Sequence, residues 1–449
     1  MIPGFPNAPL LSPVQPENLI YDPLTGIVTF LGERECDPTD PAVFIVAAQS
    51  ADLSVLGFAP SENRIVGSGA GLTYEHAFWA AAGETVERYC AAIVPTEEFL
   101  IGSYAELTHK NIPAVAPDRW ALFHPSQFPA LGLPQFDENV RVAWMKGQRL
   151  AGEGDCYLPA CLTYLSPDIR NYTVEGAAVI GPATSTGLAC AQSELEATLK
   201  GLCEVIERDA FIIRWRGALP CTRVNIDPAS PIFTTYMEKF VRPGLEYTIF
   251  QTSLDLPYHS FLGVLQDRRH TPTRILVGGA CHPDPHRAVL KTLIELAQGF
   301  QWANHVRSRK ITLDPEFSSI TTFESRMELY VFGDQQRAFD FLFDHPVTIN
   351  LSELESEERG DMATTLAEGV SRLQAMGLDP IAVDMTSSDA KECGMSVIKV
   401  VIPECEALEG DHRMPFLGGR RWREVPARIG LRPSHLTLEE RNLQPHPYP

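Results

Sequence analysis

The chain has 449 residues, and its 57 acidic and 37 basic side chains give it a formal net charge of −20 at pH 7. Its composition, 44% hydrophobic and 21% charged, is typical of a globular protein and excludes disorder throughout the chain. So acidic a chain is unsuited to nucleic-acid binding through a broad basic face, and its longest apolar runs, such as 43–48 and 397–402, are too short to span a membrane. Residues 1–6 show no signal-peptide pattern, so we expect a cytoplasmic protein that binds neither nucleic acid nor membrane.

Strand-like and helix-like segments alternate along the chain, which predicts an α/β or mixed α+β fold. In chain order the first part is predicted to contain a loose arm at 1–18, strands at 26–31 and 43–48, a Gly-rich turn at 67–73, a buried helix at 74–93, an irregular region at 110–145 and a strand at 158–165. The second part is predicted to contain a turn at 184–189, a helix at 193–215, strands at 247–251, 261–266 and 274–279, a helix at 285–306, a surface helix at 362–376 and a strand at 397–402.

The first two long helices carry the same motif after a Gly turn. The motif is Glu-x-x-Glu-Arg, and its two copies are Glu84-x-x-Glu87-Arg88 and Glu204-x-x-Glu207-Arg208. The glutamates of one copy lie 120 positions from those of the other. This internal repeat predicts two related halves that pack around a shared centre.

The spacing of these carboxylates suggests a metal site. Residues i and i+3 share a helix face, so the two glutamates of each motif point the same way, and Gln192 and Glu196 extend the stripe on the second helix. Buried carboxylates that face one another raise each other's pKa unless cations neutralise them, and Mg²⁺ binds carboxylate together with phosphate oxygens. The pattern therefore favours Mg²⁺ with a nucleoside triphosphate, whereas a single motif of this kind is more often a helical ion-pair face.

Other nucleotide and hydrolase signatures are absent from the sequence. The segment 67–71 has no lysine and is a poor P-loop, and neither the kinase motifs nor Gly-x-Ser-x-Gly occur. The His-x-Glu and Cys-x-x-Cys pair of zinc deaminases is also missing.

At these residues the sequence resembles the YcaO family over roughly 20–449. The resemblance rests on Ala80-x-x-x-Glu84-x-x-Glu87-Arg88, where the family usually starts with Ser, on Gln192-x-x-x-Glu196 with Glu204-x-x-Glu207-Arg208-Asp209, on a helix at 287–307, on an entry strand at 22–28, and on the run 394–403 with Leu417-Gly418. It implies a YcaO-type fold of two halves around a central ATP and Mg²⁺ site, divided into an arm with entry strands (1–65), a catalytic domain (66–430) and a C-terminal tail (431–449).

The resemblance also implies roles for individual residues. The implied Mg²⁺ ligands are Glu84, Glu87, Glu204 and Glu207. The implied nucleotide-binding residues are Gln192, Glu196, Arg88, Arg208, Glu295 and Gln298, and the implied catalytic residues are Arg307 and Pro449. The sequence departs from the family at Gly69-Ala70-Gly71, where many relatives have Gly-Lys-Gly, and at Trp302, where some have Arg. It leaves open which group replaces the lysine's charge.

The chain ends Pro445-x-Pro447-x-Pro449, which resembles the tail of azoline-forming YcaO cyclodehydratases. In that family the tail is implied to reach toward the active site, and a stiff polyproline II segment loses little entropy when it docks. The alternative is a frayed, solvated end. We expect deletion of the last five residues to spare thermal stability and nucleotide binding but to lower product formation.

Members of this family are implied to use ATP and Mg²⁺ to convert Cys, Ser or Thr of a ribosomal precursor peptide to thiazoline or oxazoline. The alternatives are thioamide formation with sulfide as the nucleophile, and a non-catalytic YcaO-like scaffold. Because residues 1–65 leave no room for a fused partner domain, we expect a separate E1-like or leader-peptide-binding protein, a dehydrogenase as a further possible component, and a homodimer or hetero-complex.

Overall fold

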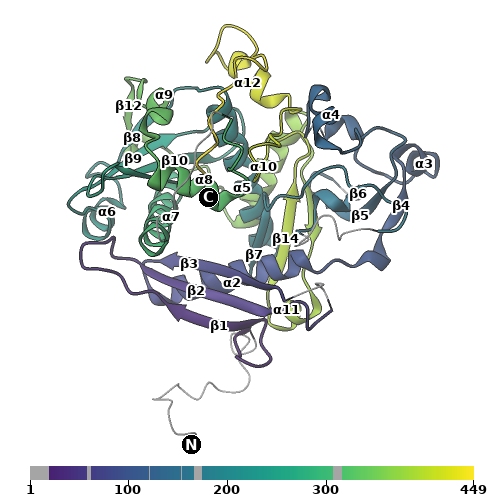
Figure 1. Ribbon diagram of the computed structural model, residues 1–449, viewed down its shortest axis with the longest axis horizontal. Coiled ribbons are helices and arrows are strands. Elements are labelled where there is room, and N and C mark those ends of the chain that lie inside the picture. The colour runs from purple at the N-terminus through teal and green to yellow at the C-terminus, as the bar shows by residue number, and fades with distance from the viewer. Residues whose placement is uncertain are drawn as a thin grey trace, which may run out of the picture.

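Three β-sheets form the framework of the protein (Figure 1). The computed structural model describes residues 20–57, 62–120, 122–152, 154–165, 174–306 and 316–448. The first sheet is antiparallel and has the order β1 (Val28–Glu33), β2 (Phe44–Asp52) and β3 (Arg64–Gly71).

The second sheet has the order β4 (Leu100–Gly102), β5 (Val142–Arg149), β13 (Ile381–Asp384), β14 (Ser396–Val401) and β7 (Leu188–Ala191), with β6 (Asp155–Pro159) also paired to β5. The third sheet has the order β11 (Arg274–His282), β10 (His259–Asp267), β9 (Leu245–Gln251), β8 (Thr222–Asn225) and β12 (Thr348–Asn350), where only the β8–β12 pair is parallel.

Three long helices each follow a strand that ends one of these sheets. They are α2 (Tyr74–Ala92) after β3, α5 (Glu194–Arg216) after β7, and α7 (Pro285–His305) after β11. Each begins with a side-chain cap, in which Thr73, Ser193 or Asp284 accepts a backbone N–H of the first turn. The predicted helices are confirmed to within about two residues, a normal uncertainty for helix ends.

The other helices in the described residues are shorter. They are α3 (Tyr104–His109), α4 (Phe128–Leu131), α6 (Phe233–Lys239), α8 (Phe323–Phe332), α9 (Asp340–Phe343), α10 (Met362–Ala375), α11 (Ser388–Glu392) and α12 (Arg421–Arg428). Single 3₁₀ turns lie at Thr96–Glu98, Pro117–Arg119, Pro125–Gln127, Ala160–Leu162, Gln336–Phe339 and Leu351–Glu353. None of the described helices is long and apolar enough to cross a membrane.

Two local predictions were wrong. Residues 67–71 form the end of β3 rather than a turn, because the glycines let α2 pack directly on the strand: a Cβ on Gly69 would lie 2.2 Å from the backbone N of Ala81. The strand predicted at 158–165 ends at Pro159, where a buried 3₁₀ turn begins. Proline has no N–H to donate to a strand partner, which agrees with an end at this position.

Helices α2 and α5 each pack against two of the sheets. Apolar residues of α2, including Ala81 and Val86, pack with Val46 of the first sheet and Met145 of the second. Helix α5 packs against β14 on one side, and its Phe211 and Trp215 pack with the third sheet and α8 on the other. The mixed α+β fold predicted from the sequence is confirmed.

Candidate functional site

A glutamate from each long helix accepts a backbone N–H from the preceding strand or, for α5, from the residue just before that strand. Glu84 accepts from Ser68 (2.7 Å), Glu204 from Gly187 (2.6 Å), and Glu295 from Gly279 (3.3 Å). The acceptor lies eleven positions after the N-cap in every case, as the pairs Thr73 and Glu84, Ser193 and Glu204, and Asp284 and Glu295 show. The internal repeat therefore extends to a third strand–helix unit, with Glu295-x-x-Gln298 in place of Glu-x-x-Glu.

The second glutamates of the two motifs are more deeply enclosed. The Glu87 side chain is 14% exposed, and Glu207 is 4% exposed as a residue. Glu207 accepts from the backbone N–H of Cys281 on β11 (3.1 Å) and from the hydroxyl of Tyr448. Burial raises the pKa of Glu87 to about 8, helped by nearby Glu204, and burial together with Glu295 raises the pKa of Glu207 to about 8.

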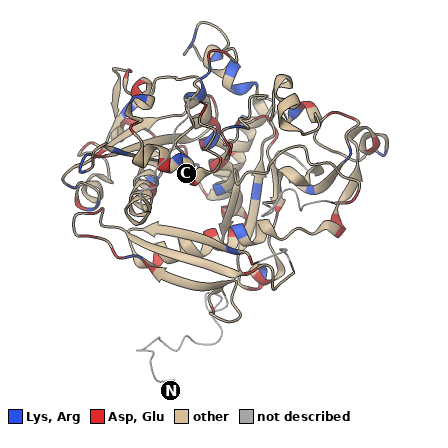
Figure 2. Cartoon of the chain, in the orientation of Figure 1, with Lys and Arg blue, Asp and Glu red and all other residues tan. Residues whose placement is uncertain are grey.

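Cationic side chains pair with two of these carboxylates. Figure 2 shows where basic (blue) and acidic (red) residues lie along the ribbon of the whole chain. Arg88 pairs with Glu87 (3.6 Å) and Arg208 pairs with Glu204 (2.8 Å). The Arg208 Nε is buried and has no hydrogen-bond partner among the described residues. A buried guanidinium N–H without an acceptor is costly, so this position favours an anion.

Two lysines that the sequence analysis did not select also belong to this cluster. Lys291 pairs with Glu295 (3.6 Å) and its side chain is 60% exposed; the nearby carboxylates of Glu295, Glu207 and Glu204 raise its pKa. Lys399 is buried on β14 and donates to the carbonyl of Thr163 (2.9 Å); burial lowers its pKa to about 7 although Glu204 opposes the shift. Lys399 could have been found from the sequence, because it lies inside the apolar run 396–401 and lysine is rarely buried without a partner.

Of the other predicted nucleotide-binding residues, Gln298 lies at this centre, whereas Glu196 and Gln192 lie at or before the start of α5. Gln298 donates to the carbonyl of Ser68 (3.1 Å) and therefore lies beside Glu84. Glu196 is 37% exposed and pairs with Lys200. Gln192 was expected on the helical stripe, but it is exposed and precedes the N-cap Ser193, so it is not on the helix. The predicted catalytic residues Arg307 and Pro449 lie outside the described residues.

The end of the chain is part of the site. His446 and Tyr448 are 1% and 3% exposed, and the carbonyls of Gln444 and Pro445 accept from Trp215 and Tyr330. The Tyr448 ring packs on Phe211 with 4.6 Å between ring centres. The idea of a frayed tail is therefore wrong for 444–448, and the expectation that its deletion spares stability is wrong for the same reason: these side chains are buried in the core beside Glu207.

The residues present fit Mg²⁺ with a phosphate ligand. No group of three or more His, Cys, Asp or Glu in the described parts of the chain forms a ready-made metal cluster. Mg²⁺ commonly binds only one or two carboxylates and completes its coordination with phosphate oxygens and water. Glu87 or Glu207 can supply such a carboxylate. The unpartnered Arg208 Nε and the exposed Lys291 amine suit the phosphates.

The raised pKa values predict how stability depends on pH when no metal is bound. A carboxyl whose pKa rises from 4.5 to about 8 on folding is favoured in its neutral form, so its contribution to stability is fully present below pH 4.5 and is lost as the pH rises toward 8. We expect Glu87→Gln to flatten the fall in stability between pH 5 and pH 8, by up to about 1.4 kcal/mol per pH unit. Urea unfolding in chelator across this range measures the slope; identical slopes for wild type and variant would contradict the assignment.

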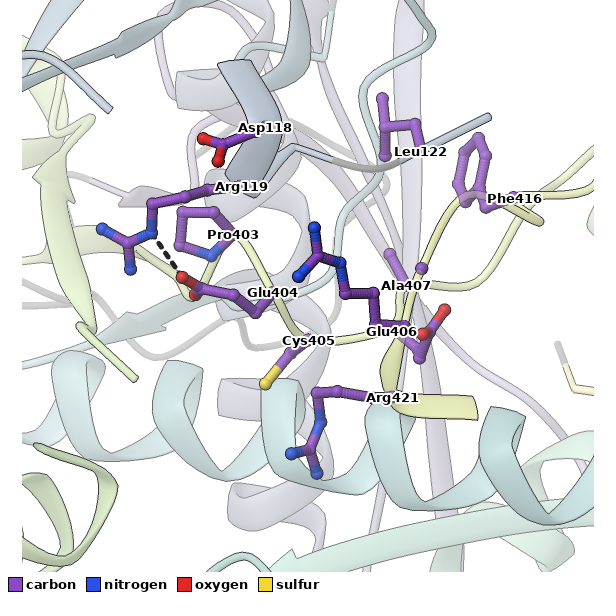
Figure 3. Close-up of a pocket in the computed structure, with 12 residues that line it drawn as sticks. Asp118, Arg119, Leu122, Pro403, Glu404, Cys405, Glu406, Ala407, Phe416 and Arg421 are labelled. Carbon is purple, nitrogen blue, oxygen red and sulfur yellow. Dashed lines mark hydrogen bonds and ion pairs between the residues drawn. The ribbon is translucent and has the colours of Figure 1, made fainter. Parts of the chain in front are cut away.

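A cavity of about 210 Å³ is lined by residues outside the glutamate motifs (Figure 3). Its walls come from the 3₁₀ turn at 117–119, the segment that follows β14, and the start of α12. Arg119 and Glu404 pair across it, and Arg421 is held by Asp209 and Asp255. The glutamate centre is the better candidate for chemistry, because it brings carboxylates of three helices together with the unpartnered Nε of Arg208.

Comparison with known proteins identifies the family of the chain. Residues 68–406 match the model of the family described as YcaO cyclodehydratase, ATP- and Mg²⁺-binding. An uncharacterised protein of Methanothermobacter thermautotrophicus is 26% identical over 368 residues, covering 79% of this chain and 85% of the relative. An uncharacterised protein in the tfuA 3′ region of Rhizobium leguminosarum bv. trifolii is 28% identical over 268 residues, covering 58% and 57%.

Solved structures with the same fold include three of direct interest. A heterocyclase in complex with substrate and cofactor superposes with a TM-score of 0.76 at 23% identity; the match covers 97% of this chain but 57% of that protein. The heterocyclase TruD gives 0.62 at 21%, covering 84% and 51%. YcaO from Methanopyrus kandleri, bound with AMPPCP and Mg²⁺, gives 0.58 at 20%, covering 84% and 86%. The chain thus spans about half the length of the two heterocyclases.

The family model covers most of the chain, including the glutamate motifs of all three helices. The chain therefore belongs to the YcaO family of ATP- and Mg²⁺-binding cyclodehydratases, which confirms the predicted resemblance, enzyme class and cofactors at the level of the family.

Proposed function

We propose that this protein converts Cys, Ser or Thr residues of a ribosomally made precursor peptide to thiazolines or oxazolines. The main support is that carboxylates and cations of three helices lie together, beside the last strands of three sheets. The chain also belongs to the YcaO family. Bound ATP would supply the phosphoryl group that turns the amide oxygen into a leaving group. The protein's own task is then to position the peptide and to neutralise phosphate charge.

The geometry supports the following division of roles. Glu84, Glu87, Glu204 and Glu207 would supply the carboxylates for Mg²⁺, one or two to an ion. The nucleotide would be surrounded by Arg88, Arg208, Glu295 and Gln298, with Gln192 before α5 and Glu196 in its first turn. Many relatives have a lysine at the position of Ala70, which here packs against an apolar cluster that includes Leu293 and Ala297 of α7. Lys291 and Lys399 would provide the missing positive charge.

Several parts of the proposal concern the whole assembly. We retain the division into 1–65, 66–430 and 431–449, with Arg307 and Pro449 as catalytic residues. A separate E1-like or leader-peptide-binding partner is proposed, with a dehydrogenase as a further component and a dimer or hetero-complex as the assembly. The microcin synthetase McbBCD, a complex of the same fold at 15% identity and a TM-score of 0.51, has been solved with pro-MccB17 bound, which supports a peptide substrate.

Mass spectrometry of a Cys-containing precursor peptide after incubation with the protein, its partner and Mg·ATP tests this function. Each azoline should lower the peptide mass by about 18 Da, one water, because the chemistry is a phosphoryl-driven dehydration. A gain in mass with sulfide present would favour thioamide formation. ATP binding without peptide change or ATP consumption would favour the scaffold.

A further inference from the structure

Strand β3 has a free edge whose hydrogen-bonding groups are only partly used. It is the last strand of the first sheet, so one side of its backbone faces away from β2. Ser68 shows which residues face outward, because its N–H donates to Glu84 and its carbonyl accepts from Gln298. Along a strand, every second residue directs both backbone groups to the same side. Val66 therefore points its N–H and its carbonyl outward, and neither has a partner among the described residues.

The side chains in the cross-strand row that includes Val66 are also exposed to solvent. Phe30 of β1 lies opposite Gln49 of β2, which in turn lies opposite Val66. Val66 is 67% exposed and Phe30 is 54% exposed. A further strand beside β3 would continue this row, and its side chain would pack against Val66.

The free edge of β11 is different. Its outward amides at Gly279 and Cys281 already donate to Glu295 and Glu207. At these two positions the edge of β11 is therefore occupied by carboxylates. The edge of β3 is closed at Ser68 and open at Val66, two residues from the cluster.

We propose that an extended segment of the peptide substrate adds to β3 as a strand, pairing with the outward backbone groups of Val66 and the preceding Arg64. This inference rests on the proposed function and names where its substrate binds. Pairing must stop at Ser68, because Glu84 and Gln298 occupy both of its outward groups. The residues of the peptide beyond that point then reach the carboxylates. Main-chain pairing requires little of the peptide sequence, apart from an apolar or small side chain to cover Val66.

Proline at position 66 tests the proposal in the full chain. Val66→Pro removes the outward N–H but no bond to β2, so the sheet should tolerate it. A labelled synthetic peptide with a central Cys should bind at least about tenfold more weakly, as expected for the loss of one or two hydrogen bonds. Val66→Ala keeps the N–H and should bind nearly as well as wild type. Glu33→Pro, at an outward position of β1 on the opposite edge of the same sheet, should leave peptide binding unchanged.

Binding is measured by fluorescence anisotropy with Mg²⁺ and a non-hydrolysable ATP analogue, alongside melting temperature and nucleotide affinity. Equal peptide affinity for Val66→Pro and Val66→Ala would overturn the inference. If the proline variant does not fold, peptides N-methylated at alternate amides replace it: only one of the two alternate sets should lose affinity, and equal behaviour of both sets would overturn the inference. Because this assay needs no turnover, a failure to form azolines would reject the proposed function and leave the strand addition standing.

Discussion

Replacing Glu207 by Gln should lower peptide-dependent ATP consumption by a factor of about 10²–10³, the range expected when a preorganised charge is removed from an active site. The protein should stay folded. Burial raises the pKa of Glu207 to about 8, so without a cation the side chain is already neutral at pH 7, and an amide resembles that form. Glutamine also keeps an oxygen that can accept from Cys281 or Tyr448.

Phosphate release and a melting curve on the same preparation measure both parts of this prediction. Glu84→Gln should behave similarly, since an amide oxygen can still accept from the N–H of Ser68 but brings no charge to a metal. Glu194→Gln is the matched control, because Glu194 is an exposed residue in the first turn of α5. Wild-type ATP consumption in both Glu207→Gln and Glu84→Gln would reject the metal assignment.

Deletion of residues 445–449 should lower both stability and product formation. The deleted segment includes His446 and Tyr448, which are almost fully buried, and the loss of one buried aromatic side chain typically costs about 3–5 kcal/mol. The deletion also leaves the hydroxyl of Tyr330 and one oxygen of Glu207 without their partners. Azoline yield should fall steeply, because the Glu207 carboxylate loses the group that orients it.

Denaturant unfolding and product yield on the truncated protein test this expectation. Tyr448→Phe separates the two effects, because the ring still packs on Phe211 while the hydroxyl that donates to Glu207 is gone. It should retain most of the stability but show altered use of Mg·ATP. An unchanged melting temperature after the deletion would show that the tail does not occupy its buried position in solution.

The family, the long helices and the residues that share one face of each helix could be predicted from the sequence. These follow from local rules: a cap, an apolar face and an i, i+3 spacing are all written in consecutive residues. The pair Glu84 and Glu87 and the pair Glu204 and Glu207 were found this way. The same rules can also reveal the third unit once the distance from cap to glutamate is compared, since Asp284 and Glu295 have the spacing of Thr73 and Glu84.

The tertiary structure alone decided which groups meet across elements far apart in the chain. Lys399 reaches the site from β14, Lys291 from α7 and Tyr448 from the end of the chain, and no local pattern links these positions. The role of Glu84 as the partner of Ser68 depends on β3 being the last strand of its sheet, and strand order is set by long-range pairing. Burial of the tail likewise depends on a core assembled from α5, α8 and β11. The amino acids near the terminus do not by themselves predict that core.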